Sequence, residues 1–100
     1  MGSTVEVLYF EGCPGHEQVL PRVRELADAH GAELLVRPVE SPEAAEQERF
    51  LGSPTIRVDG RDVDPGAAER TDYGLKCRIY RHGGTQSAFP PDAWLVAAFS

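Results

Sequence analysis

The feature that most constrains the fold is the N-terminal part of the chain, where a strand pattern, a helix pattern and a second strand pattern follow one another. Residues 4–10, TVEVLYF, are almost continuously apolar after Glu6, which predicts a central strand covered on both faces. A helix is expected from Pro14 to His30, because the apolar residues there recur at helical spacing: Val19, Leu20, Val23, Leu26 and Ala27. With a further strand at 32–39, this order predicts a parallel pair of strands joined by a right-handed crossover.

Shorter elements follow in the second half of the chain. Ser41 and Pro42 are the predicted N-cap and first residue of a short helix. Asp59-Gly60 suits the tight turn of a β-hairpin. A last helix is expected after a pair of prolines near the C-terminus. The element order predicts a single α/β domain over residues 1–100, with a mixed sheet and helices on both faces.

An insert at about residues 65–89 separates the hairpin from the last helix. Within it, residues 75–81 alternate apolar and polar side chains and so predict one extra strand. Its apolar face carries Leu75, Cys77 and Ile79. The same region is locally basic, which fits either a solvated strand and loop or an anion site: Arg70, Lys76, Arg78 and Arg81.

Length, charge and cysteine content exclude several classes of function. One hundred residues suffice for one small domain, and a net charge of −6 argues against nucleic acid as a partner. No apolar run is long enough to span a membrane and none has the form of a signal peptide, so a cytoplasmic protein is predicted. Two cysteines in a cytoplasmic protein indicate catalysis, metal binding or packing rather than a structural disulfide.

Three further features carry a resemblance to a known fold. Cys13 lies between the first strand and the first helix, Pro21 follows it by eight residues, and Ser53-Pro54-Thr55 precedes the third strand. In this order and spacing the chain resembles the thioredoxin fold. The resemblance implies a three-layer α/β/α arrangement, a βαβαββα core to which the insert is added. The chain is also similar to small bacterial thioredoxin-like proteins with a "GCP" motif, some of which are loosely labelled as alkylmercury-lyase-related.

Cys13 is the predicted nucleophile. A thiol at a helix N-terminus is stabilised as the thiolate, which is the reactive form. His16, one helical turn further on, fits a role in tuning that thiol, in proton relay or in metal binding, and equally fits a solvated first-turn histidine. The second cysteine of the thioredoxin motif is replaced by His16 and its buried acid by Val7. A small buried Cys13 that only packs is therefore the alternative.

The resemblance also implies a substrate groove formed by Pro14, Ser53, Pro54 and Thr55. A cis peptide bond before Pro54 is expected, which leaves the backbone beside Cys13 free to pair with an extended substrate strand. The alternative is an ordinary trans proline in a turn.

Cys77 has three open interpretations. Its place on the apolar face of the predicted strand favours simple burial. It is also a candidate resolving cysteine for Cys13, which requires the two Cα atoms to lie within about 7 Å. Finally, the two thiolates, with His16, form a candidate site for a soft metal such as mercury or zinc.

These features predict a thiol-based redox protein that exchanges with a disulfide- or thiol-bearing protein or small molecule. Its predicted catalytic residues are Cys13, Cys77 and His16, and no cofactor, bound metal, nucleic acid or membrane is expected. A second hypothesis is a non-catalytic binding module of the same fold, whose groove holds a partner protein or a soft metal.

Overall fold

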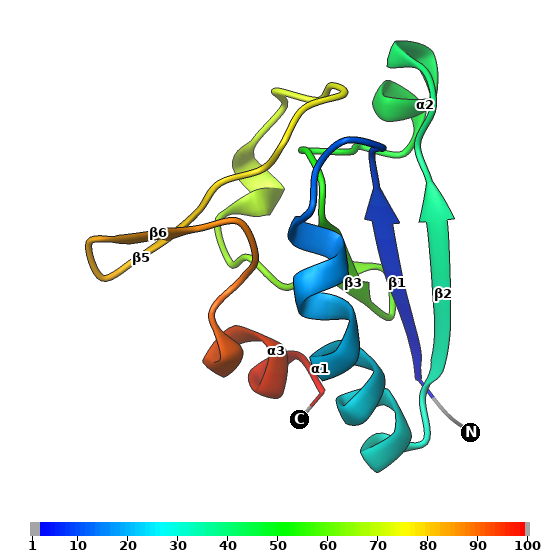
Figure 1. Ribbon diagram of the computed structural model, residues 1–100, viewed down its shortest axis with the longest axis vertical. Coiled ribbons are helices and arrows are strands. Elements are labelled where there is room, and N and C mark those ends of the chain that lie inside the picture. Colours follow the sequence, from blue (N-terminus) through cyan, green and yellow to red (C-terminus); the bar gives the residue numbers. More distant parts are fainter. Residues whose placement is uncertain (1–2, 100) are drawn as a thin grey trace.

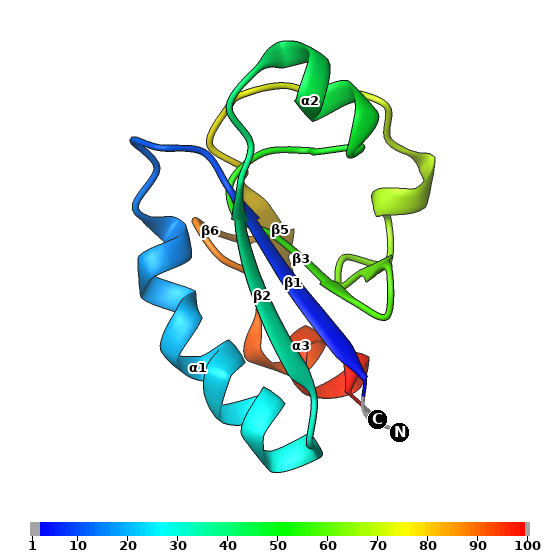
Figure 2. The same ribbon diagram turned by 90° about the vertical axis from the view of Figure 1, so that its right-hand side faces the viewer.

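A four-stranded mixed sheet with the strand order β2-β1-β3-β4 forms the centre of the molecule (Figure 1, Figure 2). The computed structural model describes residues 3–99. β1 is parallel to β2 and antiparallel to β3, and β4 is antiparallel to β3. The predicted mixed sheet with its parallel pair is therefore confirmed. Its strands are β1 (Thr4–Tyr9), β2 (Glu33–Pro38), β3 (Thr55–Val58) and β4 (Arg61–Asp62).

The predicted long helix connects β1 to β2 and is α1, Gly15–His30. Pro21 lies inside it at an exposed position. The helix ends at Gly31, whose φ of 65° is in the left-handed region that favours glycine. The residues at helical spacing form the buried stripe of α1, as expected: Val19, Val23, Leu26 and Ala27.

Two local signals in the second half of the chain are also confirmed. Ser41 caps α2 (Pro42–Gln47), because its hydroxyl accepts a hydrogen bond of 3.1 Å from the backbone N–H of Ala44. Asp59 and Gly60 join β3 to β4 with φ values of 53° and 80°. Positive φ at both central residues is what a type I′ hairpin turn requires.

Two apolar clusters lie on opposite sides of β1, because successive side chains of a strand point to opposite faces. The larger cluster joins Val5 and Val7 of β1 to the buried stripe of α1 and to Leu95 of α3 (Asp92–Ala98). In the smaller cluster, Leu8 of β1 packs with Val39, Ala45 and Phe50. The side chain of Ala45 comes from α2. The sheet thus carries α1 and α3 on one side of β1 and α2 on the other.

The extra strand predicted at 75–81 does not form as one strand. The insert contains the short helix η1 (Ala67–Glu69) and a separate ribbon of β5 (Tyr80–His82) and β6 (Thr85–Ser87), which extends away from the sheet (Figure 1). Before β5, Cys77 makes a single parallel bridge with Ser53. The pairing goes no further: this bridge is isolated, and the regular strand that follows, β5, begins at Tyr80 and pairs with β6 instead.

The expected faces of this segment are also reversed. Arg78 and Tyr80 are each only 2% exposed, whereas Cys77 is exposed and Ile79 is 51% exposed. The prediction that alternation buries the Cys77 face is therefore wrong. Its physical reason is that Arg78 pairs with the half-buried Asp62 and Asp64, which lower the cost of placing a charge inside the protein.

Candidate redox site

The two cysteines of the chain are joined by a disulfide. The Sγ atoms of Cys13 and Cys77 are 2.07 Å apart and the Cα atoms 5.6 Å apart, although 64 positions separate the residues in sequence. Of the interpretations left open for Cys77, proximity to Cys13 is the one that the structure shows, and simple burial is wrong. Neither cysteine is free in this form, so no thiolate pair is available there to a soft metal.

Cys13 is held by the junction of β1 and α1. Its backbone N–H donates to the carbonyl oxygen of Phe10 at 3.3 Å, and α1 begins at Gly15. Cys13 is only 3% exposed. Cys13 thus precedes the positive end of the α1 dipole, and the predicted stabilisation of its thiolate stays a prediction. The predicted location of the thiol is confirmed, and its shielding from solvent is an additional finding.

His16 is attached to the backbone of Cys13. Its Nδ1–H donates to the Cys13 carbonyl oxygen at 2.9 Å, and its ring stacks on Tyr9 with centroids 4.3 Å apart and planes inclined by 15°. A carbonyl oxygen accepts only, so this contact keeps a proton on Nδ1 in the neutral ring. His16 thus braces the turn into α1, and its predicted effect on the thiol stays a prediction.

The peptide bond between Ser53 and Pro54 is cis, as the resemblance implied. Pro54 is buried and packs on the first residue of α1, because a Cβ atom on Gly15 would lie 3.1 Å from Pro54 Cδ and 2.5 Å from the Ala88 carbonyl oxygen. Glycine is therefore needed at position 15. The neighbouring Thr55 donates its hydroxyl hydrogen to the Gly52 carbonyl at 2.7 Å. Pro14, the remaining predicted groove residue, is exposed.

The backbone next to this cis-proline is occupied by the chain itself. The N–H of Ser53 donates to the carbonyl of Lys76 at 2.8 Å, and the N–H of Arg78 donates to the carbonyl of Ser53 at 2.9 Å. Gly52 permits this approach, because a Cβ atom there would lie 2.9 Å from Arg78 Cβ and the φ of 124° also favours glycine. The prediction that this edge is free for a substrate strand is therefore wrong: the Cys77 segment fills it.

A buried ion pair, which sequence reasoning missed, fixes the residue after Cys77. The side chain of Arg78 is 0% exposed, and its guanidinium donates to both oxygens of Asp62, at 2.9 and 3.1 Å, and to Asp64 at 3.4 Å. Burial lowers the pKa of this guanidinium, but the negative groups around it outweigh burial and the pKa is raised. The closely spaced Asp62 and Asp64 after the hairpin turn are visible in the sequence, but they do not identify Arg78 as their partner.

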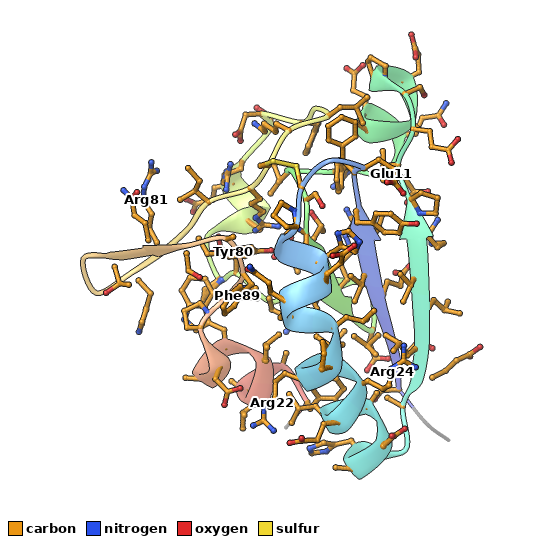
Figure 3. All side chains as sticks on the ribbon, viewed as in Figure 1. Glu11, Arg22, Arg24, Tyr80, Arg81 and Phe89 are labelled. Atoms are coloured by element: carbon orange, nitrogen blue, oxygen red, sulfur yellow. A yellow bond between two sulfur atoms is a disulfide. The ribbon has the colours of Figure 1, made fainter. Side chains whose placement is uncertain are left out.

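Tyr80 provides the second anchor. Its ring lies 4.4 Å from the Arg78 guanidinium carbon, and its hydroxyl donates to the Pro54 carbonyl at 2.6 Å. Burial raises the pKa of this hydroxyl, so it remains a donor. Figure 3 shows Tyr80 between the β5–β6 ribbon and α1, whereas its neighbour Arg81 extends from the ribbon into solvent. The cis-proline, the ion pair and Cys77 are thus one connected polar unit.

Comparison with known proteins adds no further information on the site. No protein-family model matches the chain, and no curated protein matches its sequence. Within residues 3–99, no group of three or more histidine, cysteine or acidic side chains is arranged to hold a metal ion. No helix in the same range is both long and apolar enough to cross a membrane.

Proposed function

We propose that this protein is a thiol–disulfide exchange protein of thioredoxin-like fold, with the Cys13–Cys77 pair as its working group. The observation that carries the proposal is the disulfide itself, which joins a cysteine at the N-terminus of a long helix to one 64 positions away, beside a cis-proline. Two residues this far apart in sequence meet only because Ser53, Arg78 and Tyr80 hold the insert there.

The arrangement of the elements supports the thioredoxin-like, three-layer fold that we propose. The sheet has one parallel pair, β1–β2, and a central antiparallel β3, and the helices α1 and α3 pack on the opposite side of β1 from α2. The cis-proline precedes β3 and packs on the start of α1. The resemblance implied a three-layer α/β/α arrangement and a cis-proline before the third strand.

The chemistry needs no cofactor. A thiolate from an external thiol attacks one sulfur of the disulfide, and the S–S bond electrons pass to the other sulfur, which leaves as a thiolate. The location of Cys13 at the α1 N-terminus stabilises that charge. We propose the cytoplasm as the compartment, where disulfides are typically transient and catalytic or redox-sensing rather than structural.

The reduction potential tests the proposal. The oxidised protein is equilibrated in dithiol redox buffers of graded potential, and the fraction of Cys13 and Cys77 alkylated is measured by mass spectrometry. We expect a midpoint above about −300 mV, the value below which structural disulfides resist the cellular thiol pool. A midpoint below that value would show a structural disulfide and refute the redox function. Wild-type protein reduced with excess dithiothreitol gives the signal of the fully reduced state.

A binding module is the second candidate function, and an open groove of about 700 Å³ favours it. The groove lies between the end of α2, the β3–β4 hairpin and η1, and four arginines line it although the chain is acidic overall: Arg49, Arg57, Arg61 and Arg70. Its acidic residues are already paired, Glu48 with Arg37, and Asp62 and Asp64 with Arg78. Arg57 and Arg70 are paired as well, with Glu48 and Asp72, which leaves Arg49 and Arg61 as the cations available to a ligand. An acidic partner protein is therefore the class of ligand that this groove fits.

To test this second function, calorimetry measures the binding of a glutamate-rich peptide at low and at high salt. Arg61→Ala should weaken binding, because Arg61 is exposed and lines the groove. Arg24→Ala is the matched control, since Arg24 is exposed on α1 and does not line the groove. Equal binding by both variants, or none by the wild type, would exclude the groove as an acidic-peptide site.

A further inference from the structure

We infer that Cys77, and not Cys13, is the sulfur with which an external thiol exchanges, and that Cys13 is the leaving thiolate. This reverses the roles expected from the sequence, in which Cys13 was the nucleophile and Cys77 the resolving cysteine. The inference rests on the proposed redox function and specifies how that function operates. Two independent properties of the site lead to it: access to each sulfur, and the stability of each thiolate.

Access favours Cys77. Thiol–disulfide exchange requires the incoming sulfur to reach the sulfur that it attacks. Cys13 is 3% exposed, and Gly15, two residues further on, lies close to the buried Pro54. Cys77 is exposed, and so is Ile79 on the same side of the segment. An external thiol therefore meets the disulfide from the Cys77 side.

Thiolate stability favours departure of Cys13. The leaving thiol departs faster when its pKa is lower, and Cys13 lies at the N-terminus of a 16-residue helix. No helix begins at Cys77. Its two cationic neighbours are already paired: Arg78 with Asp62, and Lys76 with Asp72 at 2.8 Å.

The carboxylate of Asp72 is hydrogen-bonded to two cationic side chains. Hydrogen bonds from Arg70, and then from Lys76, hold the pKa of Asp72 well below its usual range. The ammonium group of Lys76 therefore has an ionised carboxylate beside it, which weakens any stabilisation it could offer to a thiolate at Cys77. The better leaving group is the thiolate of Cys13.

The exchange then proceeds in two balanced steps. The thiolate of an external dithiol attacks Sγ of Cys77; the Cys13–Cys77 bond breaks, and its electron pair leaves on Cys13 as a thiolate. The second thiolate of the dithiol next attacks the first dithiol sulfur, which is bonded to Cys77 in the mixed disulfide. This step closes a cyclic disulfide and releases Cys77 as a thiolate, which takes a proton from solvent. The protein disulfide is reduced by two electrons and the dithiol is oxidised by two.

The contacts of the insert explain why a dithiol is the expected reductant. Arg78 binds Asp62, and Tyr80 binds the Pro54 carbonyl. Neither contact involves a sulfur atom, so both hold Cys77 beside Cys13 after the S–S bond has broken. A monothiol bound to Cys77 stays within reach of the Cys13 thiolate, which displaces it and restores the disulfide. A dithiol avoids this reversal because its second thiol is also attached to the mixed disulfide.

Trapping the first mixed disulfide tests the inference. The oxidised full-length protein is mixed with glutathione, quenched with acid at a series of short times, alkylated with N-ethylmaleimide and digested with trypsin. Mass spectrometry then reports which cysteine carries glutathione and which carries the maleimide. Extrapolated to zero time, we expect glutathione on Cys77 at least about tenfold more often than on Cys13. The same chain unfolded in urea is the control, for which a ratio near one is expected.

Each outcome has a separate meaning. Glutathione on Cys13, or an equal distribution in the folded protein, would overturn the assignment of roles and leave the redox function intact. A folded protein that forms no mixed disulfide and is not reduced by dithiothreitol, while the unfolded chain reacts, would overturn the proposed redox function itself. Preference for Cys77 only in the folded protein supports the inference.

Discussion

The two cysteines of the disulfide are held by different kinds of structure. Cys13 rests on the junction of β1 and α1, whose side chains, such as Val7 and Val23, belong to the larger apolar cluster. Cys77 lies in an irregular segment that makes one bridge to Ser53 and is fixed by the buried charge of Arg78. One half of the site is thus part of the hydrophobic core, and the other depends on a few polar contacts.

Because of this difference, the position of Cys77 can be disturbed without a comparable loss of stability in the rest of the fold. Apolar burial is spread over many side chains, so no single contact decides where Cys13 lies. The polar anchors of Cys77 are few and directional, and removal of one leaves a buried partner unpaired. Substitutions in the insert should therefore affect the closure of the disulfide while the β1-α1-β2 unit persists.

Replacing Arg78 with methionine should have the largest effect. The variant leaves the carboxylates of Asp62 and Asp64 without their buried counter-charge, and breaking a buried ion pair costs about 3–5 kcal/mol. Urea unfolding of the oxidised protein measures the loss. The reduced variant should also re-form the Cys13–Cys77 bridge more slowly than the wild type, as followed by loss of free thiols.

Arg81→Met is the matched control for that variant. Arg81 is exposed and extends into solvent from the β5–β6 ribbon (Figure 3), so its loss should change the free energy of unfolding by no more than about 0.5 kcal/mol. If the Arg78 and Arg81 variants lose similar stability, the ion pair does not hold the insert, and the contrast between the two halves of the site fails.

Opening the disulfide should have the next largest effect. The bridge closes a loop across 64 positions, and disulfides of this kind stabilise a fold by about 2–4 kcal/mol. Unfolding of the Cys77→Ser variant, compared with the oxidised wild type, measures this contribution. The reduced wild type should resemble the variant, because both lack the cross-link. A variant as stable as the oxidised protein would mean that the bridge contributes nothing to the stability of the fold.

The contrast between the two halves also explains what could be predicted from the sequence. β1, α1 and the Ser41 cap follow from apolar spacing and capping residues, which are local signals. The position of Cys77 depends on Asp62, which lies 16 positions before Arg78. No local pattern encodes such a contact, so alternation in 75–81 placed the apolar side chains inside.

The cis-proline and the disulfide show the same limit at the site itself. Pro54 was placed correctly by the resemblance, and its cis peptide bond is confirmed. What the resemblance did not contain is the occupation of the Ser53 edge by the insert, since that segment lies outside the part of the chain that carries the resemblance. The exposed Cys77 and the shielded Cys13 follow from that occupation, and only the packed structure shows them.

Gly52→Ala should have a smaller effect, directed at the contact between β3 and the Cys77 segment. The methyl group of an alanine at position 52 would lie 2.9 Å from Arg78 Cβ, and the alanine backbone would have to adopt a φ of 124°. The expected loss is about 1–3 kcal/mol in urea unfolding, from strain and overpacking together. Gly60→Ala is the control, because its φ is also positive, at 80°, but its Cβ would meet no atom within 4 Å. Equal losses would assign the whole effect to backbone strain rather than to the approach of the insert.

Tyr80→Phe should have the smallest effect and bears most directly on how Cys77 is held. The variant keeps the ring beside Arg78 but removes the hydroxyl that donates to the Pro54 carbonyl, a buried hydrogen bond worth about 1 kcal/mol. We expect a similar loss in the oxidised and the reduced protein, because this hydrogen bond involves neither sulfur atom and holds the segment in both states. A loss confined to the oxidised protein would mean that the segment leaves the cis-proline when the bridge opens, and that Tyr80 does not keep Cys77 beside Cys13.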